Sequence, residues 1–228
     1  MPLVAAMVVS SIGVRGQSTT AAPRPDYDID YLGPPLPDPV MQHNKETYVS
    51  FGCAYCHGLT LIARGEAADL MHSALVGADV DGSTIVPLLK AGIPQTPKLS
   101  PMPQFSDLSD QQLHAIARYI HYARQQGRYR EITQSPLPAA DAAAGKQFFD
   151  GQCATCHAAD LNGIGRKYDE AALREHVLRP GSLSVPSSFI VAAMTDSKTA
   201  QARQRHNFLL ENYTPAQVAN LVAYLTTK

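Results

Sequence analysis

The sequence contains no tryptophan, only four cysteines and few charged residues for its 228 positions. Charged side chains make up 17% of the chain, the formal net charge is −1, and no run of Lys or Arg stands out. Because nucleic-acid binding needs clustered positive charge, this composition argues against DNA or RNA as a partner. We can place no glycine-rich phosphate loop, no Ser/His/Asp constellation and no paired carboxylates on one helix face. Asp110 and Glu211 flank predicted helix ends, where we expect solvated side chains.

All the cysteines lie in two short segments, FGCAYCHGLT at 51–60 and GQCATCHAAD at 151–160. In each segment, two cysteines three positions apart are followed directly by a histidine. The residues concerned are Cys53, Cys56 and His57 in the first segment, and Cys153, Cys156 and His157 in the second.

Four interpretations explain these segments to different degrees. A disulfide within either pair would close too short a loop to be useful and would leave the histidines unexplained. Zinc sites built from two Cys-x-x-Cys pairs usually have them closer in sequence, and a thioredoxin-like motif expects one pair within a βαβ pattern. Covalent attachment of c-type haem uses all six residues, since the thiols add to the porphyrin vinyl groups and the histidine binds the iron. The sequence therefore predicts two covalent haem c groups.

The amino-terminal residues fit the core of an export signal over 1–17. Their apolar run at 2–14 is too short to span a bilayer. No basic residue precedes this run and no Ala-x-Ala site follows it, so an ordinary terminal segment stays an alternative. Haem attachment to cysteines happens outside the cytoplasm, which independently favours a periplasmic or otherwise exported protein. Residues 18–42 contain six prolines and no helical period, and we expect an extended arm there.

Two later stretches carry clear helix start signals. Ser109 and Gln112 form an S-x-x-Q capping box ahead of one helical pattern, and Thr214 and Gln217 repeat that box ahead of another. Pro215 follows the second cap at the first helical position, which its fixed backbone angle favours.

These signals belong to an internal repeat. Cys53 and Cys153 are 100 positions apart, and Tyr119 and Tyr224, which occupy the same place in the two closing helices, are 105 apart. The chain is therefore predicted to be a tandem duplication. We expect a first domain at 43–126, a polar, proline-containing connector at 127–140 and a second domain at 141–228.

Each half resembles a class I cytochrome c domain, and the chain over roughly 43–228 resembles a dihaem c-type cytochrome. The resemblance implies an all-α fold of two tandem domains, each wrapped around one covalent haem, with the terminal helices of each domain crossing beside the haem edge. That family usually has a glycine at the crossing. Gly145 fits in the second half, whereas Lys45 takes this place in the first, where we expect a looser crossing.

Haem iron needs a second axial ligand besides His57 or His157. In the first half, the stretch LSPMPQFSDLSDQQL resembles the Met-Pro-x-Phe segment of the family. Its methionine, Met102, lies 45 positions after His57 and seven before Ser109. A methionine between two prolines in a rigid loop is a poor choice for core filling, so Met102 is the predicted ligand.

The second half lacks that segment, and two ligands compete. His206 lies 49 positions after His157 and eight before Thr214, which nearly reproduces the spacing of the first half. Met194 keeps the usual thioether chemistry, but it lies 37 positions after His157 and 20 before Thr214. We favour His206 and keep Met194 as the alternative, with His176 as a weaker candidate.

Two further departures concern the surroundings of the haems. The family usually has a proline after the motif whose carbonyl orients the proximal histidine. The stretches 64–70 and 162–169 contain no proline, so another carbonyl must take this role. Arg64 and Arg166 follow the motifs at nearly matching offsets and are candidates for pairing with haem propionates, although solvated arginines would look the same.

The resemblance implies electron transfer rather than catalysis. We expect either a periplasmic carrier or the cytochrome subunit of a respiratory or dehydrogenase complex, which would contact the membrane only through that complex. The implied partners are redox proteins: a donor dehydrogenase or quinol-oxidising complex, and an acceptor oxidase or another cytochrome. A peroxidase-like dihaem enzyme, with an open or displaceable ligand at the second haem, stays an alternative.

Overall fold

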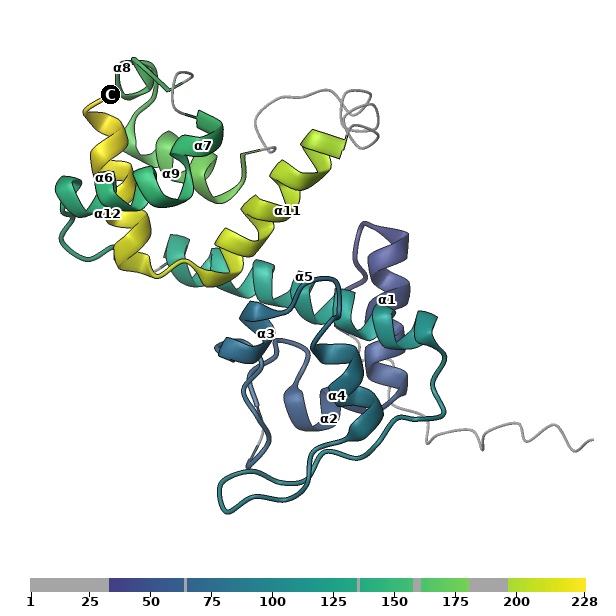
Figure 1. Cartoon of the computed structure of the whole chain (residues 1–228). Coiled ribbons are helices and arrows are strands. Elements are labelled where there is room, and N and C mark those ends of the chain that lie inside the picture. Colours follow the sequence, from purple (N-terminus) through teal and green to yellow (C-terminus); the bar gives the residue numbers. More distant parts are fainter. Residues whose placement is uncertain (1–32, 64, 135, 158–160, 181–196) are drawn as a thin grey trace, which may run out of the picture.

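The computed structural model describes residues 33–63, 65–134, 136–157, 161–180 and 197–228. Within these ranges the fold is all-α, as predicted, and the chain forms no strand beyond one isolated antiparallel bridge between Ile93 and Met102. The helices form two lobes joined by the long helix α5 (Figure 1).

The first lobe contains short helices packed around the start of α5. Its elements are α1 (Pro39–Ser50), α2 (Cys53–His57), α3 (Ala74–Ala78), α4 (Ile85–Ala91) and α5 (Asp110–Gln134). The helices α1 and α5 pack against each other and contribute half of the buried residues of the first core. At their crossing, the rings of Tyr48 and Tyr119 lie 4.9 Å apart, and each tyrosine hydroxyl donates to a backbone carbonyl of the segment that follows α2.

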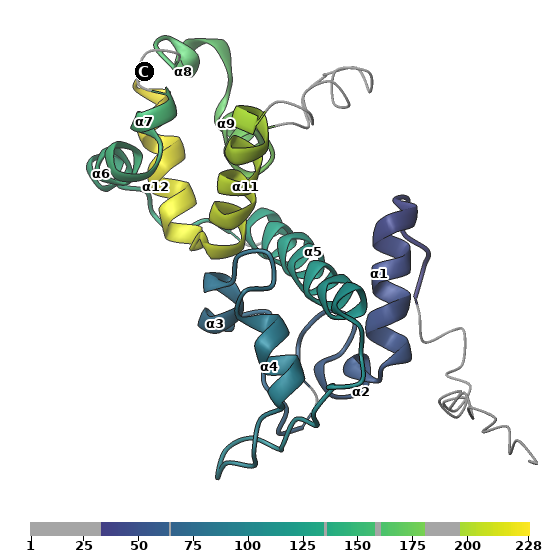
Figure 2. The same ribbon diagram turned by 45° about the vertical axis from the view of Figure 1, so that its right-hand side comes forward.

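The second lobe begins in the same way as the first, with a longer helix followed by the short Cys-x-x-Cys-His helix. Its described elements are α6 (Ala142–Gln152), α7 (Ala154–His157), α8 (Ile164–Lys167), α9 (Glu170–Leu178), α11 (Ser197–Asn212) and α12 (Pro215–Thr226). The helices α6 and α12 lie side by side, and α12 also packs on α9 (Figure 2). The aromatic pair Phe149 and Tyr224, with ring centroids 5.4 Å apart, contributes to the second core.

The crossing of α6 with α12 depends on Gly145. A Cβ atom at this position would lie 1.9 Å from the carbonyl oxygen of Asn220, so the two backbones approach as closely as the sequence predicted. In the first lobe the equivalent Lys45 is buried, and its ammonium group donates to the carbonyl of Pro34 at 2.8 Å. The α1–α5 crossing thus accommodates the long Lys45 side chain, because its ammonium group points away from the helix contact toward Pro34.

Both predicted capping boxes are present. The Ser109 hydroxyl accepts from the Gln112 backbone N–H at 3.3 Å, and the Gln112 side chain accepts from the Ser109 N–H at 2.9 Å. The same pair of bonds joins Thr214 and Gln217 at the start of α12. These helix starts are encoded locally, because each cap satisfies backbone donors with a side chain only three positions away.

The expectation of an extended arm over residues 18–42 was wrong for its last four residues, which are helical. Helix α1 begins at Pro39, where the Asp38 side chain accepts from the backbone N–H groups of Val40 and Met41. An acidic N-cap followed by proline at the first helical position is a start signal in its own right. The expected export signal at 1–17, and the arm before residue 33, lie outside the described residues.

The predicted connector also differs in its first part, because α5 continues through residues 127–134. Ile132 is completely buried in the second core, and the Arg128 guanidinium donates to the carbonyl of Tyr213. The Tyr129 hydroxyl donates to Glu175 at 2.7 Å. Contacts with the second lobe therefore keep this polar stretch helical, and α5 belongs to both lobes.

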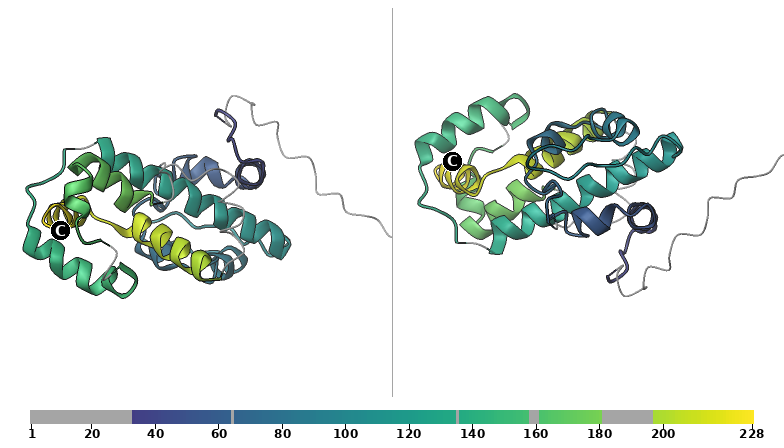
Figure 3. Two further views of the ribbon diagram at one scale, coloured as in Figure 1. Left: turned by 90° about the horizontal axis from the view of Figure 1, so that it is seen from above. Right: turned by 90° about the horizontal axis from the view of Figure 1, so that it is seen from below.

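Helix α11 packs mainly against the first lobe. Its closest helix neighbours among the described elements are α5 and α3, and it runs alongside α5 in the views from above and below (Figure 3). Leu209 and Leu210 near its end join the second core. The helix therefore connects the two lobes at a second place besides α5.

Candidate functional site

The first Cys-x-x-Cys-His segment forms the short helix α2 directly after α1. Gly52 ahead of it has φ 79°, a left-handed conformation that suits glycine and turns the chain sharply between the two helices. The Cys53 thiol is buried and the Cys56 thiol is exposed, and neither forms a disulfide. The segment thus presents its thiols from a fixed turn at the edge of the first core.

The proximal histidine of this segment is held by a backbone carbonyl. The Nδ1 atom of His57 lies 2.8 Å from the carbonyl oxygen of Ala68, in the stretch that lacks the usual proline. Burial lowers the pKa of His57, and this outweighs the opposing effect of the hydrogen bond to Ala68. A neutral ring that donates through Nδ1 keeps the lone pair of Nε2 for a metal, which is the arrangement an iron ligand needs.

Met102 lies in a loop that the first lobe fixes at its backbone. The Met102 N–H donates to the Ile93 carbonyl at 2.9 Å, and the Ile93 N–H donates back to the Met102 carbonyl at 2.9 Å. Gly92, at the end of α4, has φ 69°, and a Cβ there would lie 2.8 Å from the Met102 carbonyl oxygen. The half-buried Met102 side chain packs against the same core as Cys53. Its role as an iron ligand stays a prediction.

The second Cys-x-x-Cys-His segment follows α6 and ends in α7. Cys153 is half-buried, and burial raises the pKa of its thiol. Cys156 is exposed, and both thiols are free. The two segments lie in different lobes, with α2 and α7 far apart in the ribbon (Figure 1). A zinc site that combines both pairs is therefore not assembled.

His157 at the end of this segment faces His206 from α11. The ring centroids are 6.0 Å apart, with an angle of 62° between the ring planes. Imidazole nitrogens bind transition metals at about 2 Å, so two rings on opposite sides of one metal have centroids roughly 6 Å apart. The Nδ1 atom of the half-buried His206 is buried without a hydrogen-bond partner. Burial, followed by the nearby His157 and Arg205, lowers the pKa of His206, which favours the neutral form that can bind iron.

The other predicted site residues fall elsewhere. His176 on α9 directs Nδ1 to the Ala172 carbonyl at 2.6 Å, and its ring contacts the Tyr168 ring at a tilt of 44°, with centroids 4.3 Å apart. Arg166 on α8 is exposed. Met194 and Arg64 lie outside the described residues.

No sequence pattern indicated the ion cluster that lies between the lobes. The expectation of a solvated Glu211 was wrong: the residue is 5% exposed, and its carboxylate lies 2.8 Å from Nδ1 of His121 on α5. Asp110, by contrast, is exposed as predicted and pairs with Lys90 at 2.7 Å. Only the packing of α11 on α5 brings the buried partners together, so a local pattern could not reveal them.

Two features are absent from the described ranges. No three His, Cys, Asp or Glu side chains there form a group that could hold a metal ion by themselves. No helix in the same ranges is both long enough and apolar enough to cross a membrane.

Comparison with known proteins finds a family match for each half of the chain. Residues 142–228 match the family model "Cytochrome c", and residues 40–120 match the model "Cytochrome C oxidase, cbb3-type, subunit III". Cytochrome c-555 of Chlorobaculum thiosulfatiphilum is 34% identical over 85 residues, which cover 37% of this chain and 93% of that protein. No solved structure gives a significant match.

The fold and the two haem-binding motifs define a helical protein of the haem-carrying electron-transfer class. The chain belongs to the c-type cytochromes, and each of its halves matches a cytochrome domain.

Proposed function

We propose that the protein is a dihaem cytochrome c that passes electrons between two covalently bound haems, one in each lobe. The observation that carries the proposal is that each lobe has its own Cys-x-x-Cys-His helix placed beside its own pair of packed helices. The thiols of Cys53, Cys56, Cys153 and Cys156 would hold the two porphyrins.

Bound haem supplies a single iron that alternates between the ferric and ferrous states. The chain's own residues set the environment of that iron. In the first lobe, the Ala68 carbonyl orients His57, and Met102 would provide a thioether ligand. In the second lobe, His157 and His206 would provide two imidazoles. The two irons would then differ in potential, because a thioether favours ferrous iron more than an imidazole does.

Such a difference would give electron flow a direction. Electrons would enter at the second lobe, where the potential would be lower, and leave through the first lobe. The likeness of residues 40–120 to a subunit of a cbb3-type oxidase supports a membrane-bound oxidase or its partners as the acceptor class. The location would be the exported side of the membrane, where haem is attached to cysteines.

The decisive experiment is intact-mass measurement of the purified, coloured protein. We expect a mass that exceeds that of the polypeptide by two haems, and colour that stays with the protein through acid-acetone extraction. Replacing Cys153 and Cys156 with Ala should remove one haem and leave the other. A parent protein that carries a single haem, or none, would refute the proposal.

A further inference from the structure

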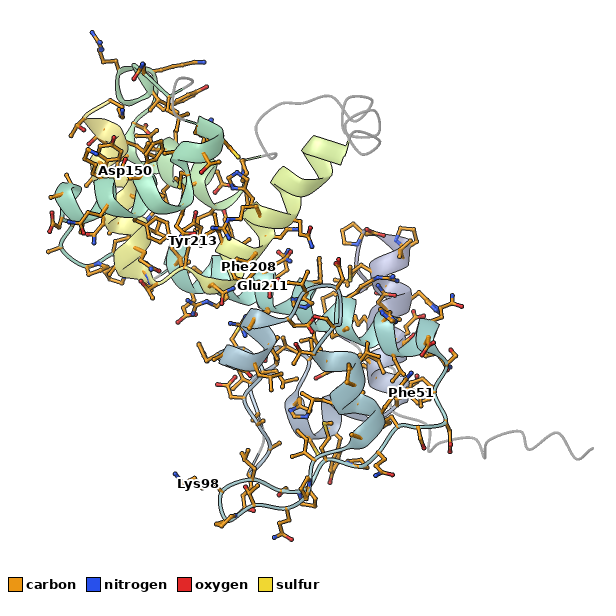
Figure 4. All side chains as sticks on the ribbon, in the orientation of Figure 1. Phe51, Lys98, Asp150, Phe208, Glu211 and Tyr213 are labelled. Carbon is orange, nitrogen blue, oxygen red and sulfur yellow. The ribbon has the colours of Figure 1, made fainter. Side chains whose placement is uncertain are left out.

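A buried cluster of charged groups fastens the end of α11 to the first lobe. His121, on α5, lies between two carboxylates: its Nδ1 is 2.8 Å from Oε2 of Glu211, and its Nε2 is 2.8 Å from Oδ2 of Asp79. Glu211 comes from α11, and Asp79 directly follows α3. Figure 4 shows Glu211 where α11 meets α5.

The two carboxylates on either side of His121 favour a ring that carries two protons. An ionised carboxylate only accepts hydrogen bonds, so both ring nitrogens must donate and the ring is an imidazolium. Burial by itself would lower the pKa of His121, but the hydrogen bonds and charges of Glu211 and Asp79 outweigh burial and raise it. The ring is 18% exposed in the wall of an open cleft of about 700 Å³ between the lobes, so solvent protons can reach it.

The groups around His121 are otherwise satisfied. Both oxygens of Asp79 are also occupied by backbone N–H groups of Gly82, Thr84 and Ile85. The second oxygen of Glu211 accepts from Gln125 at 2.9 Å. Arg124 lies beside Glu211, and the other charged or titratable residues that line the cleft with His121 are His114, Arg118, Tyr122 and Asp81.

Two more contacts hold the same end of α11. The Arg124 guanidinium donates to the Glu211 carbonyl at 3.3 Å, and the Asn212 side chain donates to the Gly77 carbonyl at 2.9 Å. Desolvation of these buried charges offsets much of their attraction, whereas removal of one partner would leave a buried charge uncompensated.

His206 lies on the same helix, five positions before Glu211 and so about 7.5 Å along the axis. No proline or glycine interrupts α11 between them. The position of the His206 ring relative to His157 therefore depends on how the first lobe holds the end of α11.

We infer that His121 and Glu211 are positioning residues for the second iron, and that the proton on His121 controls how firmly His206 is held. This inference rests on the proposed ligation by His206. When the imidazolium loses a proton, one of its nitrogens presents a lone pair to a carboxylate, and that contact becomes repulsive. The end of α11 then loosens, and His206 leaves the iron more readily.

The test measures the rate at which carbon monoxide binds to the second haem. Stopped-flow mixing of the reduced, full-length holoprotein gives this rate from pH 5 to pH 9. In the parent, we expect the rate to rise as pH passes through the His121 pKa. In Glu211→Gln and in His121→Gln, we expect a rate that is about tenfold higher at low pH and that no longer changes across this range. Asp110→Asn, which removes an exposed carboxylate of the first lobe, is the matched control and should follow the parent.

Circular dichroism and the spectrum of the first haem report whether each variant is folded. If His121→Gln yields no folded protein, Glu211→Gln is sufficient for the test, because it keeps the shape and polar character of the side chain. Rates in both variants that overlay the parent at every pH would overturn the inference. His206→Ala separates this failure from failure of the ligand assignment: if carbon monoxide enters His206→Ala no faster than the parent, the ligation by His206 and the inference fall together.

Discussion

The imidazole ring centroids of His157 and His206 lie 6.0 Å apart, although 49 positions separate the two residues in the sequence. One ring comes from the short helix α7 and the other from α11, which packs on the opposite lobe. This distance suits two nitrogen ligands on either side of a single metal. It is the strongest geometric argument for choosing between the two ligands that the sequence left open.

Replacing His206 with Ala should open the second haem to external ligands. Removing the imidazole leaves an axial position vacant, so we expect tight binding of carbon monoxide to the ferrous form and of cyanide to the ferric form at one haem. Met194→Ala is the matched comparison and should leave both haems closed. The opposite pattern, with only Met194→Ala opening the site, would show that spacing and ring geometry both misidentified the ligand.

Replacing Met102 with Ala should lower the potential of one haem and leave the other nearly unchanged. The thioether favours ferrous iron, and its loss removes that preference. A spectroscopic redox titration measures both centres, and in the parent we expect two separate waves, with the bis-histidine centre at the lower potential. The band near the red end of the ferric spectrum that marks methionine ligation should also disappear. A titration of the variant that matches the parent would remove Met102 from the ligand set.

The ion cluster should make stability depend on pH in a defined direction. Because Glu211 and Asp79 raise the pKa of His121 above its unfolded value of about 6.5, the folded protein binds this proton more tightly. The resulting stabilisation is fully present below about pH 6.5 and is lost as pH rises through the folded-state pKa. Urea unfolding of the parent and of His121→Gln should therefore show a difference in unfolding free energy that shrinks over this range. A difference that grows with pH would contradict the assignment of the proton.

Replacing Gly145 with Ala should destabilise the second lobe by about 1–3 kcal/mol, because the new methyl group meets the Asn220 backbone at the α6–α12 crossing. Gly151→Ala is the matched control in the same helix. A Cβ at Gly151 meets nothing within 4 Å, and the substitution should be neutral or stabilising by up to about 1 kcal/mol. Thermal unfolding followed by circular dichroism distinguishes the two. Equal stability of both variants would mean that the crossing is not as tight as described.

The sequence by itself determined the features that depend on neighbouring residues. The two Cys-x-x-Cys-His motifs and the capping boxes at Ser109 and Thr214 follow from side chains a few positions apart, and the resemblance to class I cytochrome c domains added the close crossing at Gly145. They predicted an all-α cytochrome c fold in two halves, and the structure and the family comparisons agree.

Tertiary structure decided what depends on contacts between distant segments. Residues 127–134 look like a polar connector, yet they are helical because Ile132 is buried in the second core. Glu211 looks like a solvated residue at a helix end, yet it is buried because α11 packs on α5 and brings it to His121. The carbonyl that orients His57 comes from Ala68, whose backbone oxygen carries no sequence signal. Burial and hydrogen bonding between separate segments set these features: the partners of Ile132 and Glu211 lie in other helices, and the Ala68 carbonyl belongs to a loop of the same lobe as His57.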